Sequence, residues 1–148
     1  MKPVITFAFF VAIANAALCQ IKNDDILGKW IAYPKQNMIV EIFRDSNQYK
    51  GKLLWFKDSD DPSRPMATRT DDKNPDPEKR KRLLLMSEVM DGLVYNKASS
   101  KWEDGTIYDA KAGKMWDAAV TMRQDGSLEV RGFWHYRFIG KTMIFKRI

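Results

Sequence analysis

Acidic side chains are the residues of this sequence best suited to chemistry, and they gather in two places. Asp71, Asp72 and Asp76 lie close together, and Asp109 follows a Gly-Thr-Ile-Tyr segment. Two carboxylates held side by side could act as a general acid and a general base, or bind a hard cation such as calcium. The same residues suit structural roles, because Asp caps helices and closes turns, while others are simply solvated. No calcium-loop spacing is present, so we favour the structural interpretation and assign no metal ligand.

Other catalytic chemistry finds little support. His135 is the only histidine, which argues against a zinc site and against a serine triad that needs a histidine. The only cysteine, Cys19, lies next to an apolar leader. We therefore predict no catalytic residue and no cofactor, and we expect a binding protein rather than an enzyme. A hydrolase built on two carboxylates stays open as a further alternative.

Aromatic side chains offer a second kind of chemistry, the binding of an apolar or sugar-like ligand. Aromatic residues on strands are more often plain core, so composition alone does not decide between the two roles. The aromatic candidates for a pocket are Trp55, Trp102, Tyr108, Trp116, Phe133 and Trp134. Together with the acidic loop they give a predicted ligand-binding set of Asp72, Asn74, Asp76, Tyr108, Asp109, Trp116, Trp134 and Tyr136.

The elements that must position these residues are short strands. Residues 102–122 form the central pair, in which Thr106, Ile107 and Tyr108 favour a strand and residues 109–113 supply a turn. Residues 83–95 are ambiguous between a helix that ends at Gly92 and a strand that bends at Asp91-Gly92, and we favour the strand. The other predicted strands begin near Gly28, Met38, Tyr49, Leu128 and Gly140. Eight short antiparallel strands predict an all-β, up-and-down barrel, with a two-sheet sandwich as the alternative.

One long charged loop, residues 57–82, interrupts this rhythm. Its four prolines exclude a central strand, and Asp76-Pro77-Glu78 predicts a short helix with Asp76 as its N-cap. In a meander the loops alternate between the two ends of the barrel. The connections 34–37, 57–82, 109–113 and 134–139 therefore share one rim, where the long loop, Asp109 and His135-Tyr136 should meet.

The first 19 residues read as a secretory signal peptide, because Lys2 precedes an uncharged apolar run with small residues near its end. We expect a periplasmic or secreted protein, with residues 20–148 as one domain and no membrane span after cleavage. A lipid anchor at Cys19 is the minor alternative. The formal net charge is +6, which we attribute to solubility, and we expect no nucleic-acid partner.

Several motifs follow one another in an order that resembles a known family. They are Gly28-x-Trp30, Asp72-Lys73-Asn74-Pro75-Asp76-Pro77 and Gly105-x-Ile107-Tyr108-Asp109. The sequence is similar to the domain of unknown function 2147 family of exported bacterial proteins. This resemblance implies a lipocalin-like barrel and no established activity. By analogy with lipocalins it places Trp30 at the closed end, where Arg131 or Arg147 stacks on it, so Gly28, Trp30, Arg131 and Arg147 are predicted to be structural.

Arg131 has an alternative role, which is to neutralise an anionic ligand inside the barrel; we prefer the stacking role. At the level of function we expect a small amphipathic or anionic ligand at the rim that carries residues 57–82. The alternative is a cell-envelope interaction module with a filled barrel, which docks on an envelope protein or on cell-wall material.

Overall fold

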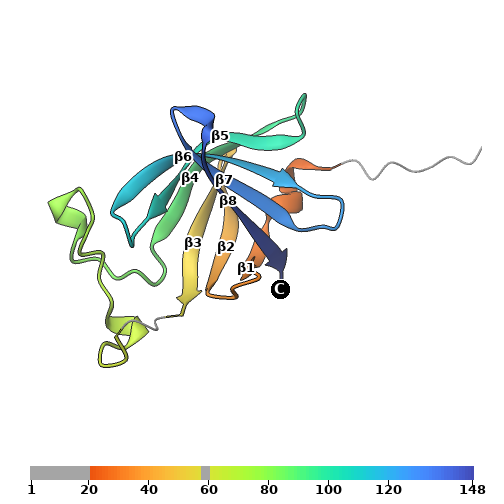
Figure 1. The fold of residues 1–148 in the computed structure, drawn as a ribbon. Helices are drawn as coiled ribbons and strands as arrows, with labels where there is room; N and C mark the ends of the chain where they lie inside the picture. The colour runs from red at the N-terminus through yellow and green to blue at the C-terminus, as the bar shows by residue number, and fades with distance from the viewer. Residues whose placement is uncertain (1–20, 58–60) are drawn as a thin grey trace, which may run out of the picture.

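The computed structural model describes residues 21–57 and 61–148, and its strands form one closed antiparallel barrel (Figure 1). Each strand pairs with its neighbour in the chain, and the last pairs with the first. The up-and-down barrel is therefore confirmed. The signal peptide predicted for residues 1–19 lies outside the described residues. The strands are β1 (Gly28–Tyr33), β2 (Met38–Asp45), β3 (Gln48–Phe56), β4 (Glu88–Asn96), β5 (Lys101–Asp109), β6 (Lys114–Met122), β7 (Leu128–Trp134) and β8 (Tyr136–Arg147).

Strand β4 settles the ambiguous segment. Residues 88–96 form a strand, so the favoured strand is confirmed and the helical alternative is wrong. Gly92 has a φ of +70°. The buried residues on either side of it, Met90 and Leu93, are three positions apart, whereas a regular strand would bury residues two positions apart. The bend at glycine therefore lets the strand keep apolar side chains on the lumen face although the simple alternation breaks.

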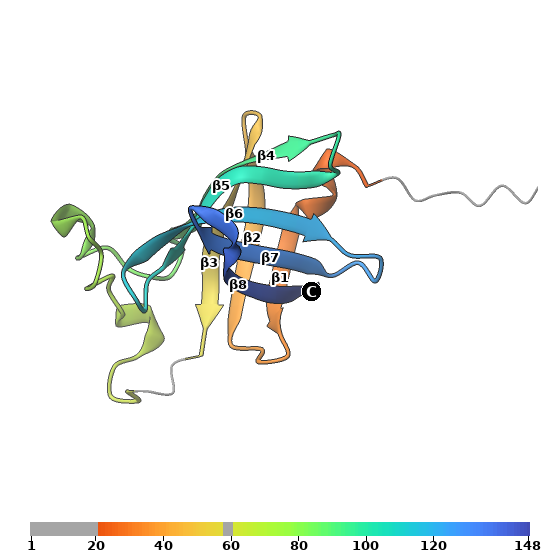
Figure 2. The same cartoon turned by 45° about the horizontal axis from the view of Figure 1, so that its top comes forward.

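The N-terminal segment closes one end of the barrel. A short 3-10 helix, η1 (Asn23–Ile26), lies across that end (Figure 2). The buried Trp30 donates from Nε1 to the Ile26 carbonyl at 2.9 Å, and Trp102 donates to the Asn23 carbonyl at 2.9 Å. Each indole thus buries its rings and satisfies its one donor, which explains why tryptophan suits this place.

Of the two arginines predicted to stack on Trp30, Arg147 does so. Its guanidinium carbon lies 4.2 Å from the ring centroid of Trp30, and Nη1 donates to the Leu27 carbonyl at 2.7 Å. Gly28 has a φ of +123°, and a Cβ there would lie 2.8 Å from Arg147 Nη1, so glycine fits both the backbone and the stacked side chain.

The stacking role and the lumen role predicted for Arg131 are both wrong. Its neighbours Val130 and Gly132 are buried on the lumen side, so Arg131 points out of the barrel. There it donates from Nε to the Arg137 carbonyl at 2.6 Å and from Nη1 to Thr142 Oγ1 at 2.9 Å. Arg131 therefore ties β7 to β8 on the outer surface.

The long loop between β3 and β4 projects from the side of the barrel away from η1 (Figures 1 and 2). It contains two single-turn 3-10 helices, η2 (Met66–Thr68) and η3 (Pro77–Lys79). Asp76 accepts from the Glu78 N–H at 3.0 Å, which confirms the predicted N-cap. Lys73 Nζ donates to the Lys111 carbonyl at 2.9 Å, so the long loop meets the β5–β6 turn at the shared rim.

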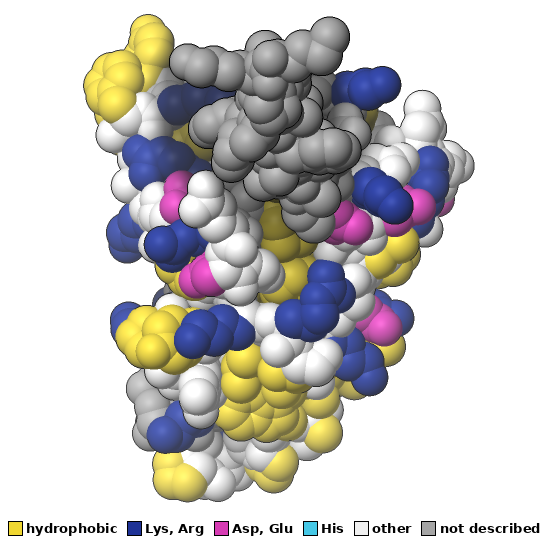
Figure 3. Space-filling view, turned by 90° about the vertical axis from the view of Figure 1, so that its right-hand side faces the viewer, with side chains coloured by type: hydrophobic (Ala, Val, Ile, Leu, Met, Phe, Trp, Pro, Cys, Tyr) yellow, Lys and Arg dark blue, Asp and Glu magenta, His cyan; other side chains and the backbone are white. Residues whose placement is uncertain are grey.

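Basic side chains dominate the charged surface. Figure 3 shows lysine and arginine side chains around apolar patches on one face, with fewer acidic side chains between them. This agrees with the formal net charge of +6 and favours anionic molecules as neighbours. In the described part of the chain, no helix is both long enough and apolar enough to cross a membrane.

Candidate ligand-binding site at the open rim

The predicted site residues fall into two groups on opposite surfaces of the barrel wall. One group lies outside β5, under the long loop, and includes Tyr108 and Asn74. The other lies at the open rim on the lumen side and includes Trp116 and Trp134. The two groups have different chemistry.

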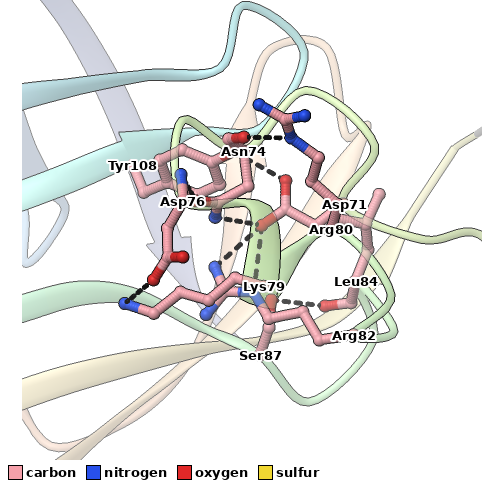
Figure 4. A network of polar contacts seen from close by, with 9 residues as sticks. All are labelled: Asp71, Asn74, Asp76, Lys79, Arg80, Arg82, Leu84, Ser87 and Tyr108. Carbon is pink, nitrogen blue, oxygen red and sulfur yellow. Dashed lines mark hydrogen bonds and ion pairs between the residues drawn. The ribbon is translucent and has the colours of Figure 1, made fainter.

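The group under the long loop is centred on Asp71, which is only 1% exposed. Its carboxylate accepts from Tyr108 Oη at 2.6 Å, from Asn74 Nδ2 at 2.7 Å and from Arg82 Nε at 2.9 Å (Figure 4). The Arg82 guanidinium also lies 5.6 Å from the ring centroid of Tyr108. Among the described residues no buried side-chain nitrogen or oxygen lacks a hydrogen-bond partner, so this cluster is a latch that holds the long loop against β5.

Burial in this latch, together with the hydrogen bond to Asp71 and the charge of that carboxylate, raises the pKa of Tyr108 to about 12. The neutral phenol is therefore the form that the folded protein holds. A buried, neutral tyrosine whose hydroxyl already donates to a carboxylate is a structural group, not a free contact for a ligand.

Tyr108 was predicted to line the ligand pocket, but it is not among the residues that line the rim pocket, and the cause is a β-bulge. Trp102 pairs with Val120, but Gly105 pairs with Ala118, so β5 carries one extra residue, and Asp104 within it has a φ of +62°. The bulge reverses the faces of the residues that follow it. Trp102 therefore points into the lumen, whereas Tyr108 points out to the loop.

The predicted loop residues have structural partners as well. The Asn74 side-chain oxygen accepts from the Asp76 N–H at 2.9 Å, and Asp109 accepts from the Ala112 N–H at 3.2 Å in the β5–β6 turn. Asp72 is exposed, and its hydrogen bond from Thr70 lowers its pKa. The capping and turn-closing roles are confirmed for Asp76 and Asp109. The solvated role is wrong for Asp71, which is the centre of the latch.

The second group lies around an open pocket at the rim. Trp116 and Trp134 meet edge to face, with ring centroids 6.2 Å apart and planes at 81°. The pocket beside them has a volume of about 520 Å³. Its lining residues are Gly113, Lys114, Met115, Trp116, Trp134 and Ile139.

The two tryptophans project from the lumen face of their strands. A Cβ on Gly132 would lie 2.7 Å from Ile107 Cδ1 and 3.6 Å from Trp116 Cβ, so these three positions share the lumen face. Trp134 is two residues from Gly132 on β7 and therefore has the same orientation. The predicted pairing of Trp116 with Trp134 at one site is thus what the structure shows, and Ile139 and Met115 are pocket residues that the sequence did not reveal.

The remaining aromatic residue of the predicted set, Tyr136, lies beside the pocket rather than in it. Tyr136 and Phe138 stack at 5.5 Å on the β7–β8 hairpin and are 61% and 79% exposed. His135, at the tip, contacts the Trp134 ring edge to face at 5.1 Å. Among the described residues, no three histidine, cysteine or acidic side chains come together as a metal site.

Comparisons with known proteins agree with this fold. A protein from Helicobacter pylori, HP1028, described as belonging to the lipocalin family, superposes with a TM-score of 0.68 at 20% sequence identity, over 83% of this chain and 82% of that one. None of the curated proteins compared with the chain matches it. The family model described as an uncharacterised protein conserved in bacteria, DUF2147, matches residues 28–147. The chain therefore belongs to the DUF2147 family and has a lipocalin-like barrel.

Proposed function

We propose that this protein binds a small amphipathic molecule at the open end of its barrel. The observation that carries the proposal is the pocket of about 520 Å³ beside the lumen-facing pair Trp116 and Trp134. Pockets for small ligands have volumes of roughly 300–1,000 Å³ and are lined mainly by apolar and aromatic side chains. Lys114 at the edge of the pocket supplies a polar contact beside this apolar wall.

The exposure of the aromatic wall supports binding. Trp134 is 50% exposed although it belongs to a strand of the barrel wall. A ligand that covers this ring would remove apolar surface from water, which stabilises a complex by about 25 cal/mol for each Å². The leader-like sequence of residues 1–19 supports a place in the periplasm or outside the cell, where the ligand would be met.

A second candidate is the cell-envelope interaction module, and one observation favours it. The stacked Tyr136 and Phe138 expose most of their surface on the hairpin next to the pocket. Exposed aromatic groups of this kind also occur where proteins dock. The experiment below therefore separates pocket residues from hairpin residues.

The test is a fluorescence titration with N-phenyl-1-naphthylamine, a neutral aromatic probe whose emission rises in apolar sites. We expect saturable binding of one probe per protein and at least a fivefold weaker affinity in Trp134→Ala and in Trp116→Ala. Phe138→Ala is the matched control, because it removes an exposed aromatic ring from the same hairpin without changing the pocket lining. If wild-type protein shows no saturable binding, the proposal fails. If Phe138→Ala weakens binding as much as Trp134→Ala does, the site is the hairpin surface instead.

A further inference from the structure

We infer that the ligand of the rim pocket is an anion and that Lys141 receives its charge. This inference rests on the proposed binding function and adds the chemical class of the ligand, a small aromatic or alkyl carboxylate or sulfonate. Its basis is the placement of one lysine on the lumen face of β8.

The strand register places Lys141 inside the barrel. Lys141 pairs with Gly132, Met143 with Val130, and Phe145 with Leu128. Residues that pair directly across two antiparallel strands point to the same side of the sheet. Val130, Gly132 and Leu128 all face the lumen, so the side chain of Lys141 starts from the lumen face as well.

Exposure along β8 shows how far the lumen is open. Phe145, at the closed end, is 5% exposed, whereas Met143 is 38% exposed and Ile139, in the pocket wall, is 50% exposed. Lys141 lies between Ile139 and Met143 and is also exposed. The open mouth of the barrel therefore extends down to Met143, and Lys141 lies on the same strand between Met143 and Ile139, which lines the pocket.

The charge of Lys141 is not neutralised by the protein. In residues 21–57 and 61–148, its ammonium group forms no ion pair and no hydrogen bond, although other basic residues of β8 have partners: Arg137 pairs with Glu103 at 3.1 Å, and Lys146 lies 3.7 Å from the ring centroid of Tyr33. Those two point outward.

The mouth of the barrel carries a positive balance. The register pairs Asp109 with Lys114 at the strand ends, on the same face as Ile107 and Trp116. Asp109 already accepts from the Ala112 N–H in its own turn. On the lumen face of β5, β6 and β8 at the mouth, two lysines, Lys114 and Lys141, thus stand against one carboxylate, that of Asp109. An unpaired ammonium group beside an apolar aromatic wall matches a molecule that has an apolar body and one negative group.

The experiment compares two probes that differ by one sulfonate group. Anilinonaphthalene-8-sulfonate carries a sulfonate on the same ring system as the neutral N-phenyl-1-naphthylamine. Both would be titrated into wild-type protein, Lys141→Gln and Lys146→Gln at low salt, after matched melting curves show that all three are folded. Lys146→Gln is the control because it removes the same charge from the outer face of the same strand.

We expect wild-type protein to bind the sulfonate more tightly than the neutral probe. Lys141→Gln should weaken sulfonate binding about fivefold and leave neutral binding unchanged, whereas Lys146→Gln should behave like wild type. The effect should shrink in 0.5 M salt, because ions screen exposed charges. An unchanged sulfonate affinity in Lys141→Gln, or an equal loss for both probes, would overturn the role of Lys141 while the binding function stands. Failure of both probes to bind wild type would overturn the binding function and this inference with it.

Discussion

At the scale of single residues, Asp71 is the group on which the most contacts depend. It is buried and accepts hydrogen bonds from Tyr108, Asn74 and Arg82. A buried carboxylate is stable in a protein only when such donors replace the water it loses. Removal of its charge therefore leaves Arg82 without its counter-ion and turns one acceptor oxygen into a donor.

We predict that Asp71→Asn lowers the free energy of unfolding by about 2–4 kcal/mol, because a broken buried charge pair leaves unsatisfied groups behind. Urea unfolding followed by tryptophan fluorescence would measure the change. Asp72→Asn is the matched control, since the neighbouring carboxylate is exposed, and it should change stability little. Equal effects of the two substitutions would show that the latch is not what stabilises the loop.

The buried tyrosines make stability depend on alkaline pH. Burial raises the pKa of Tyr49 and of Tyr108 to about 12, with Asp24 and Asp71 respectively adding to the effect. In the unfolded chain a tyrosine loses its proton near pH 10, so only the unfolded state ionises between about pH 10 and 12. The contribution of these tyrosines to stability is thus complete below pH 10 and is lost as pH rises to about 12.

We therefore predict that urea midpoints fall between pH 10 and 12 and that Tyr108→Phe reduces this fall. Absorbance at 295 nm should show Tyr49 and Tyr108 ionising late in the folded protein, and only Tyr49 of this pair in Tyr108→Phe. A full complement of tyrosines ionising together near pH 10 in folded wild-type protein would contradict the latch geometry.

At the scale of elements, the closed end depends on a segment that has little secondary structure of its own. Residues 21–27 contain only the single turn η1, and side chains from β1, β3, β4, β5 and β8 hold it in place. Tyr49 donates to Asp24 at 2.7 Å and Tyr95 to the Ile21 carbonyl at 2.8 Å, in addition to the contacts of Trp30, Trp102 and Arg147.

We predict that Arg147→Ala destabilises the fold by about 2 kcal/mol, through the loss of the cation–π contact and of the hydrogen bonds to the Asp25 and Leu27 carbonyls. Arg131→Ala is the control, because that arginine lies on the outer surface and should cost less than about 1 kcal/mol. Chemical denaturation would compare the two, and hydrogen exchange should show faster exchange in residues 21–27 only for Arg147→Ala. A larger loss of stability in Arg131→Ala than in Arg147→Ala would contradict the role of Arg147 in holding the closed end.

The sequence was informative where alternation and turn residues were regular. Eight strands and the Asp76 cap follow from local patterns, and the structure confirms them. Of the predicted shared rim, the contact between the long loop and the β5–β6 turn is confirmed. The face of Tyr108 could not be predicted, because it depends on the bulge at Asp104, and a one-residue shift moves every later side chain to the other face. The face of Trp55 could not be predicted for the same reason. Ile39 pairs with Trp55 but Val40 pairs with Leu53, so β3 carries an extra residue just before Trp55.

The burial of Asp71 was hidden for a different reason. Its donors come from positions up to 37 residues away, and only the packing of the long loop on β5 brings them together. The chain also gave no local sign that Ile139 lines the pocket, since its position depends on the irregular pairing between Phe133 and Trp134 opposite β8.

At the scale of the whole molecule, the barrel has a filled half and an open half. Trp30, Trp102 and Leu128 are fully buried at or near the closed end, whereas Trp134 and Met143 face an open mouth. Stability and binding should therefore depend on different residues, which is the arrangement expected of a binding site placed on a rigid scaffold.

We predict that Trp134→Ala lowers the free energy of unfolding by less than about 1.5 kcal/mol, because half of its surface is already exposed. Trp102→Ala, which opens a cavity in the filled half, should cost about 3–5 kcal/mol. Thermal and urea unfolding would measure both. A large loss of stability in Trp134→Ala would mean that the rim is part of the core.

The most direct test of the central claim is native mass spectrometry of the protein purified from its own host, followed by identification of whatever it releases on denaturation. We predict a stoichiometric small molecule with a negative group on wild-type protein, retained in Phe138→Ala and absent from a folded Trp116→Ala/Trp134→Ala double variant. An apo mass for wild-type protein under gentle conditions, or the same adduct on the double variant, would contradict a binding site at the rim.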